Sequence, residues 1–529
     1  MRNLVILIIT VCIFVSPVGA DEPLTYELED IFTAKIPRME RLNQAQWHPD
    51  GESYVFVKPD TTDNIKSLYR HDVQTGEETL WIDGNKFVHP ETGESIRFSD
   101  YTITDSGEKI MLKAEARRVW RRFSLARFYV YDISDQSVTA VYGGDERISH
   151  AKLSPDEQKA GYVLDNNIFI KDLESGQVTQ VTSDGSDTII NGQFDWVYEE
   201  EFGIADGWRW SPDGQKMAFW RFDQSEVPTF SWTVFSPANG NVKTIRYPKA
   251  GDTNSTVRIG VYHLENEQTV WMDSGEESDI YIPRIQWTND SDILSIQRLN
   301  RLQNRLELLL ADAYSGQSET VFVDSDTCWV DVDDDLIFLE EQEAFLFTSE
   351  RSGYNHIYKI AMDGSSVEPI TSGKWVVKNI YGVDEDADAI YFSANKDAVT
   401  ETHVFKITSD GRDLQKLTTI PGSHSARFST DMDYFIHRYS SLNTPTQISL
   451  RDANGTLQNK LIQNALPDSV KPNLAIPDLI TFRTSDGTTI NARITKPKNF
   501  DPQKTYPVLI YGYGGPGSQL VRNSWGRST

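Results

Sequence analysis

Three consecutive carboxylates are the stretch of this sequence best suited to chemistry. Glu199, Glu200 and Glu201 follow two large aromatic residues, Trp196 and Tyr198, in a chain otherwise dominated by short alternating segments. Adjacent carboxylates repel one another, so their expected use is to hold a cation. The alternative is solvated surface, because the chain has 78 acidic residues and a net charge of −27. Composition alone favours this second interpretation.

Length, charge and cysteine content limit the class of protein. A chain of 529 residues is too long for one ordinary core, so we expect two or more domains. The negative charge argues against nucleic acid and anionic membrane surfaces as partners. The nine histidines carry no surrounding motif and, with no CxxC pair either, we expect no metal and no cofactor. Cys328, in the stretch 326–330 (DTCWV), is predicted to be a buried strand residue.

Residues 1–20 have the features of an export signal. Arg2 supplies a positive start, an apolar run extends from Leu4 to Val15, and small residues end at Ala20. The run is short for a membrane-spanning helix. We therefore expect a secreted or periplasmic protein, with a membrane-anchored form retaining an uncleaved signal as the alternative.

One pattern recurs from about residue 45 to residue 465. Each copy is an alternating strand that runs into a Gly or Asp turn, followed by a second strand. Eight copies at a spacing of about 40 to 60 residues indicate propeller blades of about four strands each. The copies cover residues 68–76, 129–135, 168–176, 257–264, 308–316, 357–364, 404–411 and 448–455. We predict a mainly β protein with an eight-bladed β-propeller over residues 21–466.

The longest gap in the repeat contains the acidic triplet, between the copies at residues 168 and 257. An insertion of this kind leaves a blade at the rim or the central channel. We expect a short helix or loop that Trp196 and Tyr198 pack down. On a helix the three glutamates point in different directions, so two converge on a target and the third turns away.

Residues 467–529 are expected to begin a second domain. Residues 472–477 form the predicted linker, and 479–487 with 489–497 predict two strands joined by an Asp-Gly turn. Residues 506–511 predict a buried strand that runs into the glycine-rich stretch 512–518. A strand followed by such a loop resembles the third strand of an α/β-hydrolase, whose loop supplies part of an oxyanion hole. The sequence contains no Gly-x-Ser-x-Gly.

Several stretches together resemble the dipeptidyl peptidase IV family of serine peptidases over nearly the whole chain from about residue 25. They are 195–201 (DWVYEEE), 513–519 (YGGPGSQ), 120–122 (WRR), 299–304 (LNRLQN) and 349–356 (SERSGYNH). The resemblance implies an eight-bladed propeller on an α/β-hydrolase domain, with release of N-terminal dipeptides after proline or alanine. Relatives of the same fold that lack the glutamate pair, such as oligopeptidases, fit less well.

The resemblance also implies roles for individual residues. Glu200 and Glu201 match the pair that holds the free ammonium group of a peptide substrate. Arg121 matches an arginine that binds the substrate carbonyl and steadies this pair, with the neighbouring Arg122 as an alternative one position away. Tyr513 matches a tyrosine that donates its hydroxyl to the oxyanion.

The family's Ser, Asp and His have no counterpart before Thr529. We therefore expect residues 467–529 to be an incomplete catalytic domain, residues 479–529 to be poorly ordered or aggregation-prone, and the 529-residue chain alone to be inactive. The expected partner is a peptide with a free N-terminus, and a homodimer of the full-length form is left open. The alternative function is a non-catalytic propeller that binds peptides or proteins.

Overall fold

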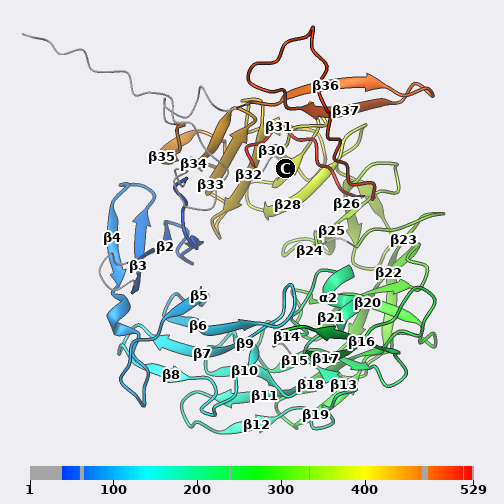
Figure 1. Ribbon diagram of the computed structural model, residues 1–529. Coiled ribbons are helices and arrows are strands. Elements are labelled where there is room, and N and C mark those ends of the chain that lie inside the picture. The colour runs from blue at the N-terminus through cyan, green and yellow to red at the C-terminus, as the bar shows by residue number, and fades with distance from the viewer. Residues whose placement is uncertain are drawn as a thin grey trace, which may run out of the picture. The chain divides into compact units, whose positions relative to one another are not determined.

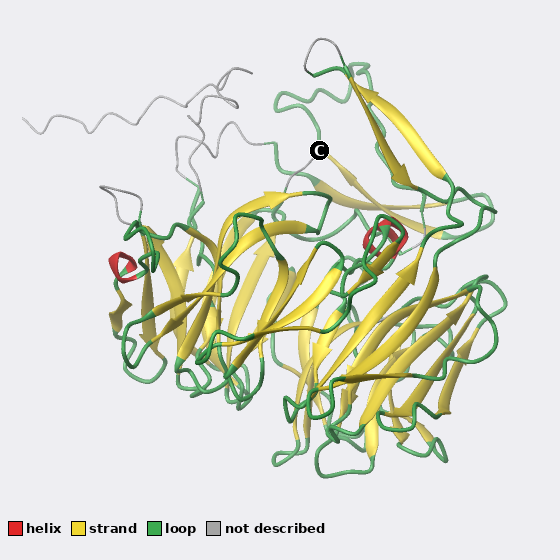
Figure 2. Cartoon of the chain, turned by 90° about the horizontal axis from the view of Figure 1, so that it is seen from below, coloured by secondary structure: helices red, strands yellow, loops and turns green. Residues whose placement is uncertain are grey.

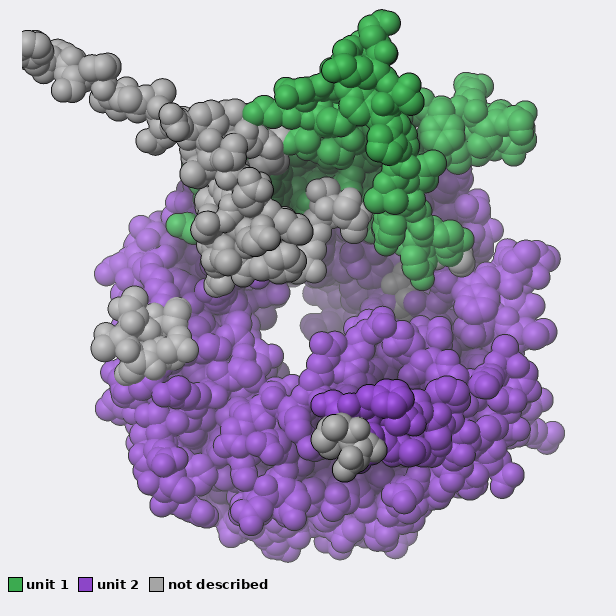
Figure 3. Space-filling model, in the orientation of Figure 1, with its two compact units in different colours: residues 1–40, 440–446, 463–529 green, residues 41–439, 447–462 purple. Residues whose placement is uncertain are grey.

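The computed structural model describes residues 39–59, 65–236, 240–332, 334–466, 475–515 and 517–526. The expected export signal at residues 1–20 and residues 472–474 of the predicted linker lie outside these ranges. The chain divides into two compact units (Figure 3). The larger unit comprises Arg41–Tyr439 and Gln447–Ile462, and the smaller comprises Met1–Glu40, Ser440–Thr446 and Gln463–Thr529.

Blades 1 to 3 are antiparallel four-stranded sheets, each made of consecutive strands. Blade 1 consists of β1 (Gln46–Trp47), β2 (Ser53–Pro59), β3 (Lys66–Asp72) and β4 (Glu78–Ile82). The 3-10 helix η1 (Gly84–Lys86) leads to blade 2, which consists of β5 (Phe98–Ile103), β6 (Lys109–Arg118), β7 (Ser124–Asp132) and β8 (Val138–Ala140). Blade 3 consists of β9 (Ser149–Leu153), β10 (Lys159–Leu164), β11 (Asn167–Asp172) and β12 (Val178–Gln180).

Blade 4 departs from this plan, because its first strand is split. It consists of β13 (Ile189–Asn191), β14 (Trp208–Trp210), β15 (Lys216–Asp223), β18 (Thr256–His263) and β19 (Gln268–Trp271). Both β13 and β14 pair with β15, and α2 (Trp196–Glu201) lies between them in the chain. A separate two-stranded hairpin, β16 (Thr229–Val234) and β17 (Asn241–Arg246), is inserted between β15 and β18.

Blades 5 to 8 return to four consecutive strands. Blade 5 consists of β20 (Ile280–Trp287), β21 (Ile293–Asn300), β22 (Arg305–Asp312) and β23 (Ser318–Ser325). Blade 6 consists of β24 (Ile337–Phe338), β25 (Ala344–Ser349), β26 (His356–Ala361) and β27 (Val367–Pro369). Blade 7 consists of β28 (Val377–Asp384), β29 (Ala389–Ala394), β30 (His403–Ile407) and β31 (Gln415–Lys416). Blade 8 consists of β32 (Ser423–Phe428), β33 (Tyr434–Ser441), β34 (Thr444–Asp452) and β35 (Leu457–Gln463).

The predicted eight-bladed propeller is confirmed. Each of the eight sequence copies overlaps the third strand of one blade, from β3 in blade 1 to β34 in blade 8. In the larger unit the sheets follow one another around a ring with a central opening, and almost all regular structure is strand (Figures 1 and 2).

The core lies between neighbouring blades, because successive side chains of a strand point to opposite faces. In β2, Val55 and Val57 join a cluster with blade 2, whereas Tyr54 and Phe56 pack towards Ile436 of blade 8. Similar clusters occupy the other junctions, and the largest extends over blades 4, 5 and 6. Because apolar side chains alternate along a strand, the two faces of each sheet pack against the two neighbouring blades.

The ring closes without a strand shared between its first and last blades, because both sheets consist of consecutive strands. Side chains make the junction instead. The Trp47 indole N–H donates to the Arg427 carbonyl at 2.8 Å, and the Arg427 guanidinium donates to the Ala45 carbonyl. The Thr430 hydroxyl donates to the Pro49 carbonyl at 3.2 Å.

The smaller unit contains the predicted hairpin but not the predicted buried strand. β36 (Asp478–Arg483) pairs with β37 (Thr489–Ile494), and Gly487 in the turn has a φ of +86°. Residues 506–511 form no strand, and Val508, Leu509 and Ile510 are 79–95% exposed. The prediction of a buried strand there is wrong for the described structure, because β36 and β37 pair only with each other and offer no further strand for residues 506–511 to join.

Candidate functional site

The acidic insertion of blade 4 is closed at its base by two glycines. Gly207 donates its N–H to the Gly192 carbonyl at 3.1 Å, and Gln193 forms a β-bridge with Asp206. A Cβ on Gly207 would lie 2.5 Å from backbone atoms of Gly192 and Gln193, so only glycine allows this approach. Residues 193–206 therefore leave the blade and return to it at one fixed point.

Helix α2 is short, and its two ends are defined by side-chain and backbone chemistry. The Asp195 carboxylate caps the N-terminus by accepting from the Tyr198 N–H at 3.0 Å. Gly203 follows the last turn with a φ of +71°, and a Cβ there would lie 3.2 Å from the Arg122 guanidinium. A helix of six residues is not stable alone, so tertiary contacts must hold it.

Blades 4 and 5 supply two of these contacts. Asp195 also accepts from the Ser255 hydroxyl at 2.6 Å, and the Tyr198 hydroxyl accepts from the Ile282 N–H of β20 at 2.8 Å. Burial raises the pKa of the Asp195 carboxyl, and the Ser255 and Tyr198 hydrogen bonds oppose that rise. Tyr198 is 2% exposed, and the Trp196 ring lies 4.3 Å from the Tyr247 ring. The two aromatics therefore pack the helix down, as the sequence predicts.

The three glutamates point in different directions. Glu199 is 3% exposed, and its Oε1 accepts from the backbone N–H groups of Arg122 and Phe123. Glu200 keeps 30% of its side chain exposed, and Glu201 is exposed. Glu199 is thus the member that turns away from solvent, and the convergence of Glu200 and Glu201 on one target stays a prediction.

Arg121 is the arginine that pairs with this acidic group. Its Nη2 lies 3.0 Å from Glu200 Oε1, and its side chain is 67% exposed. Arg122 contributes its backbone N–H to Glu199 and its guanidinium lies beside Gly203. Among the residues that the structure describes, Glu201 makes no ion pair. Glu200, Glu201 and Arg121 together carry one net negative charge, which suits a cationic group with several N–H donors.

A partly buried polar group lies next to the site in blades 3 and 4. The Phe123 ring stacks on His150 at 5.6 Å, and burial lowers the pKa of His150 to about 4. Lys152 Nζ lies 2.7 Å from both carboxylate oxygens of Asp206, and burial lowers the pKa of Lys152 to about 8. This ion pair connects β9 to the returning end of the insertion and so fixes the insertion against blade 3.

Tyr513 lies in the smaller unit, and its side chain is 63% exposed in a segment without regular structure. A Cβ on the neighbouring Gly515 would lie 2.8 Å from the Tyr513 ring. Its role as an oxyanion donor stays a prediction.

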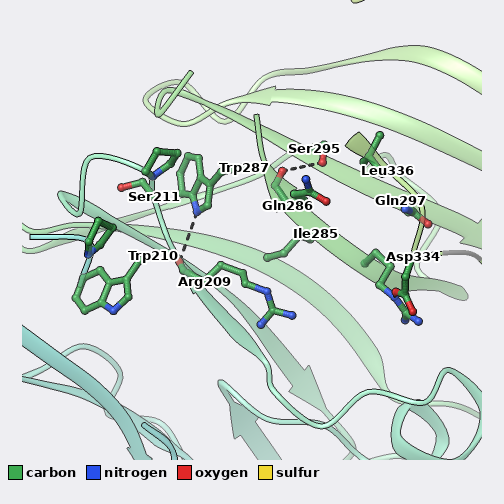
Figure 4. Close-up of a pocket in the computed structure, with 13 residues that line it drawn as sticks. Arg209, Trp210, Ser211, Ile285, Gln286, Trp287, Ser295, Gln297, Asp334 and Leu336 are labelled. Carbon is green, nitrogen blue, oxygen red and sulfur yellow. Dashed lines mark hydrogen bonds and ion pairs between the residues drawn. The ribbon is translucent and has the colours of Figure 1, made fainter. Parts of the chain in front are cut away.

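A cavity of about 430 Å³ lies elsewhere in the larger unit (Figure 4). Four consecutive blades, 3 to 6, contribute to its lining, which combines the Trp210 and Trp287 rings with the polar side chains of Arg209, Gln286 and Gln297. The Trp287 indole N–H points to the Arg209 carbonyl at 3.5 Å, and Ser295 donates to the Gln286 carbonyl at 2.7 Å. Glu200, Glu201 and Arg121 do not line this cavity.

Two further sequence predictions concern cysteine and histidine. Cys328 is exposed in the loop after β23, so its prediction as a buried strand residue is wrong. Of the two apolar residues that follow it, Val330 is buried and Trp329 is 51% exposed. Six of the nine histidines are buried, namely His71, His263, His356, His403, His424 and His437. In the described ranges no cluster of three or more His, Cys, Asp or Glu side chains could hold a metal ion.

Sequence reasoning missed the partners of the site residues. Ser255, Ile282 and the backbone of residues 122 and 123 are 60 to 84 residues from their helix partners. The Asp195 cap was readable, because Asp before an aromatic and acidic run is a helix-start signal. In the described part of the chain, no helix has the length and apolar character needed to cross a membrane.

Comparisons with known proteins cover most of the chain. Residues 104–446 match the family model described as the dipeptidyl peptidase IV (DPP IV) N-terminal region. A probable dipeptidyl peptidase 4 of Aspergillus fumigatus is 28% identical over 506 residues, which are 90% of this chain and 63% of that protein. A probable dipeptidyl-aminopeptidase B of Talaromyces marneffei is 28% identical over 523 residues, covering 89% of this chain and 57% of that protein.

A solved structure gives the same picture. The crystal structure of Porphyromonas gingivalis dipeptidyl peptidase 4 superposes with a TM-score of 0.86 at 30% identity, covering 96% of this chain and 72% of that one. The chain thus spans about three fifths of the length of the curated relatives named here. The larger unit is an eight-bladed propeller, and its blade 4 carries an acidic helix between the two halves of a split strand. The chain belongs to the dipeptidyl peptidase IV family.

Proposed function

We propose that this chain is the substrate-selecting propeller of an exported serine-type dipeptidyl peptidase, which releases X-Pro or X-Ala dipeptides from peptide N-termini. The observation that carries the proposal is the acidic pair on α2. Glu200 and Glu201 stay accessible on a helix held by three blades, with Arg121 3.0 Å from Glu200. The names of the relatives support peptidase activity in this family.

The acidic pair suits the ammonium group of a peptide. An ammonium group has three N–H donors, and two carboxylates accept from it through charge-assisted hydrogen bonds. Arg121 prevents Glu200 and Glu201 from repelling each other and has further donors for a substrate carbonyl. A fixed ammonium site sets the distance from the N-terminus to the bond that is cut, which accounts for release of dipeptides.

The remaining parts of the proposal extend beyond the acidic site. Tyr513 donates its hydroxyl to the oxyanion, catalysis by the whole protein uses a Ser, Asp and His triad, and the 529-residue chain by itself is inactive. The reaction uses neither a metal nor a cofactor. Residues 1–20 export the protein to the periplasm or the medium, or retain it at the membrane if uncleaved, and the full-length form is proposed to act as a homodimer.

Hydrolysis of Gly-Pro p-nitroanilide by two proteins tests this function. One is the 529-residue chain, and the other is the gene product read to its natural stop codon. We expect activity in the longer protein alone, no activity on the N-acetylated substrate, and a KM raised tenfold or more by Glu200→Ala or Glu201→Ala. Cleavage of the acetylated substrate at an equal rate would overturn the proposed role of the pair.

A non-catalytic propeller that binds peptides is the second candidate. Its supporting observation is the accessible acidic pair itself, which can bind an ammonium group whether or not the peptide is then cut. An inactive longer gene product that still binds Gly-Pro peptides through Glu200 would support it.

A further inference from the structure

The buried glutamate of the triplet makes a contact that its two accessible neighbours do not. Glu199 Oε1 accepts from the backbone N–H of Arg122 at 2.5 Å and from that of Phe123 at 3.2 Å. These two residues precede Glu199 by 77 and 76 positions and belong to blade 2, whereas α2 belongs to blade 4. The carboxylate therefore connects two blades that are not neighbours in the ring.

A carboxylate is an unusual choice for a purely structural contact at this position. Glu199 is 3% exposed, and its Oε2 has no hydrogen-bond partner among the described residues. Removing a carboxylate from water is unfavourable, and buried charges are weak contributors to stability even when they are paired. An apolar side chain of the same size would leave the N–H groups of Arg122 and Phe123 without this acceptor, so the contact acts on the loop that it holds and not on core packing.

The loop that Glu199 holds is the loop that carries Arg121. Residues 119–123 connect β6 to β7, and Arg118 donates to the carbonyls of Trp120 and Arg121 at 2.8 and 2.6 Å. Glu199 then fixes the backbone on the other side of Arg121, at the next two N–H groups. The backbone of Arg121 is thus held from both directions.

The same contact also sets where Glu200 lies. Glu200 follows Glu199 in α2, so one carboxylate links the backbones that carry both members of the Arg121 and Glu200 ion pair. Without that link the pair would join two side chains that are 67% and 30% exposed, and exposed pairs of this kind contribute little, because ordering both side chains costs entropy.

We propose that Glu199 is a positioning residue for peptide binding, because it holds the Arg121 loop against α2 and so assembles Arg121, Glu200 and Glu201 before the substrate arrives. This inference rests on the proposed function, since it concerns the same ammonium site. Glu199 does not contact the substrate itself. This positioning requires an acceptor oxygen on the residue 199 side chain and does not require its negative charge.

Two substitutions separate the oxygen from the charge. Glu199→Gln keeps an acceptor oxygen for both N–H groups, and Glu199→Leu keeps the bulk but removes every acceptor. Ser255→Ala is the matched control, because it deletes a hydrogen bond to the N-cap residue of α2 without touching the Arg121 loop. If Glu199→Leu does not fold, Glu199→Asp replaces it, since its carboxylate is one methylene short of the loop.

The first measurement is the KM and kcat of the full-length gene product for Gly-Pro p-nitroanilide. Glu199→Leu should raise KM tenfold or more and change kcat less than threefold, whereas Glu199→Gln and Ser255→Ala should stay within threefold of wild-type KM. A wild-type KM in the Leu variant, or an equal rise in Ser255→Ala, would overturn the inference.

The second measurement is hydrogen exchange at the backbone amides of Arg122 and Phe123 in the 529-residue chain, which requires no activity. Exchange there should accelerate at least tenfold in Glu199→Leu and remain slow in Glu199→Gln. Unchanged exchange in the Leu variant would refute the contact. If instead Glu200→Ala leaves KM unchanged while the exchange results hold, the proposed function fails and the positioning contact stands.

Discussion

At the scale of single residues, two neighbouring arginines have separate tasks. Arg121 uses its guanidinium, which lies 3.0 Å from Glu200, whereas Arg122 uses a backbone N–H that any residue except proline would supply. Sequence alone left these two positions as alternatives. In the structure Arg121 forms the ion pair with Glu200, and its role in binding a substrate carbonyl stays a prediction.

Substitution of each arginine by alanine tests that division. Arg121→Ala removes the proposed charge-assisted hydrogen bond from the guanidinium to the substrate carbonyl, which is worth about 1.5–3 kcal/mol. The KM for Gly-Pro p-nitroanilide should therefore rise roughly ten- to hundredfold. Arg122→Ala keeps the backbone N–H. The KM of this variant should therefore be at least fivefold lower than the KM of Arg121→Ala. Because the Arg121 side chain is 67% exposed, the thermal unfolding midpoint should hardly move in that variant. The reverse order of KM effects would contradict the assignment.

At the scale of elements, the junction of blades 7 and 8 contains a chain of stacked histidine rings. The Arg451 Nε donates to His437 Nδ1 at 3.1 Å, which leaves the proton of His437 on Nε2. That Nε2 lies 2.8 Å from His424 Nδ1, and His424 Nε2 donates to the Ile420 carbonyl at 2.7 Å. The His403 ring stacks on His424 at 4.8 Å and bonds Glu401. Both ring nitrogens of His424 are therefore hydrogen-bonded in its neutral form.

The stability of this junction should fall in weak acid. Burial, with His403, Arg451 and Lys416 nearby, lowers the pKa of His424 to about 4 from its ordinary 6.5. Because the unfolded chain binds the proton more readily, the stabilising effect is complete above pH 6.5 and is lost as the pH falls towards 4. Between pH 7.5 and pH 5 the loss for this group is about 2 kcal/mol.

Urea unfolding of wild type and His424→Gln at these two pH values measures the effect. Glutamine does not titrate, so the fall in unfolding free energy between pH 7.5 and pH 5 should be smaller in the variant by roughly 2 kcal/mol. An identical pH dependence in both proteins would show that His424 is charged, or accessible, in the folded state.

The elements show how far sequence patterns determine this fold. The alternation in residues 68–76 and its seven counterparts identifies the third strand of every blade, because the pattern depends on local burial on both faces of a strand. The apolar residues 506–511 carry an equally clear pattern but form no strand, since a strand requires partners that no local pattern supplies. Helix geometry predicted that the three glutamates point in different directions, whereas the partner of Glu199 lies 77 residues away and was not predictable.

At the scale of the whole molecule, the ring is closed by side chains between blades 1 and 8. The buried residues of that junction are Ala45, Tyr54 and Phe56, a smaller cluster than the one between blades 1 and 2. Because fewer buried side chains hold this junction than the one between blades 1 and 2, it should open first of the two.

Phe56→Ala and Phe98→Ala test the order of opening. Both side chains are buried, at 5% and 3% exposed, so each substitution should lower the unfolding free energy by about 3–5 kcal/mol. Hydrogen exchange should accelerate in β1 and β32 only in Phe56→Ala, because Phe98 packs between blades 1 and 2. Equal acceleration around the ring in both variants would mean that the propeller opens as one unit.

The central claim is that the acidic pair on α2 binds a peptide N-terminus, and a structure of the protein with a bound, uncleaved tripeptide tests it most directly. The account predicts the ammonium nitrogen within about 3 Å of a carboxylate oxygen of both Glu200 and Glu201, with Arg121 still paired to Glu200. A peptide whose ammonium group lies elsewhere, for example in the cavity lined by Trp210 and Trp287, would contradict it.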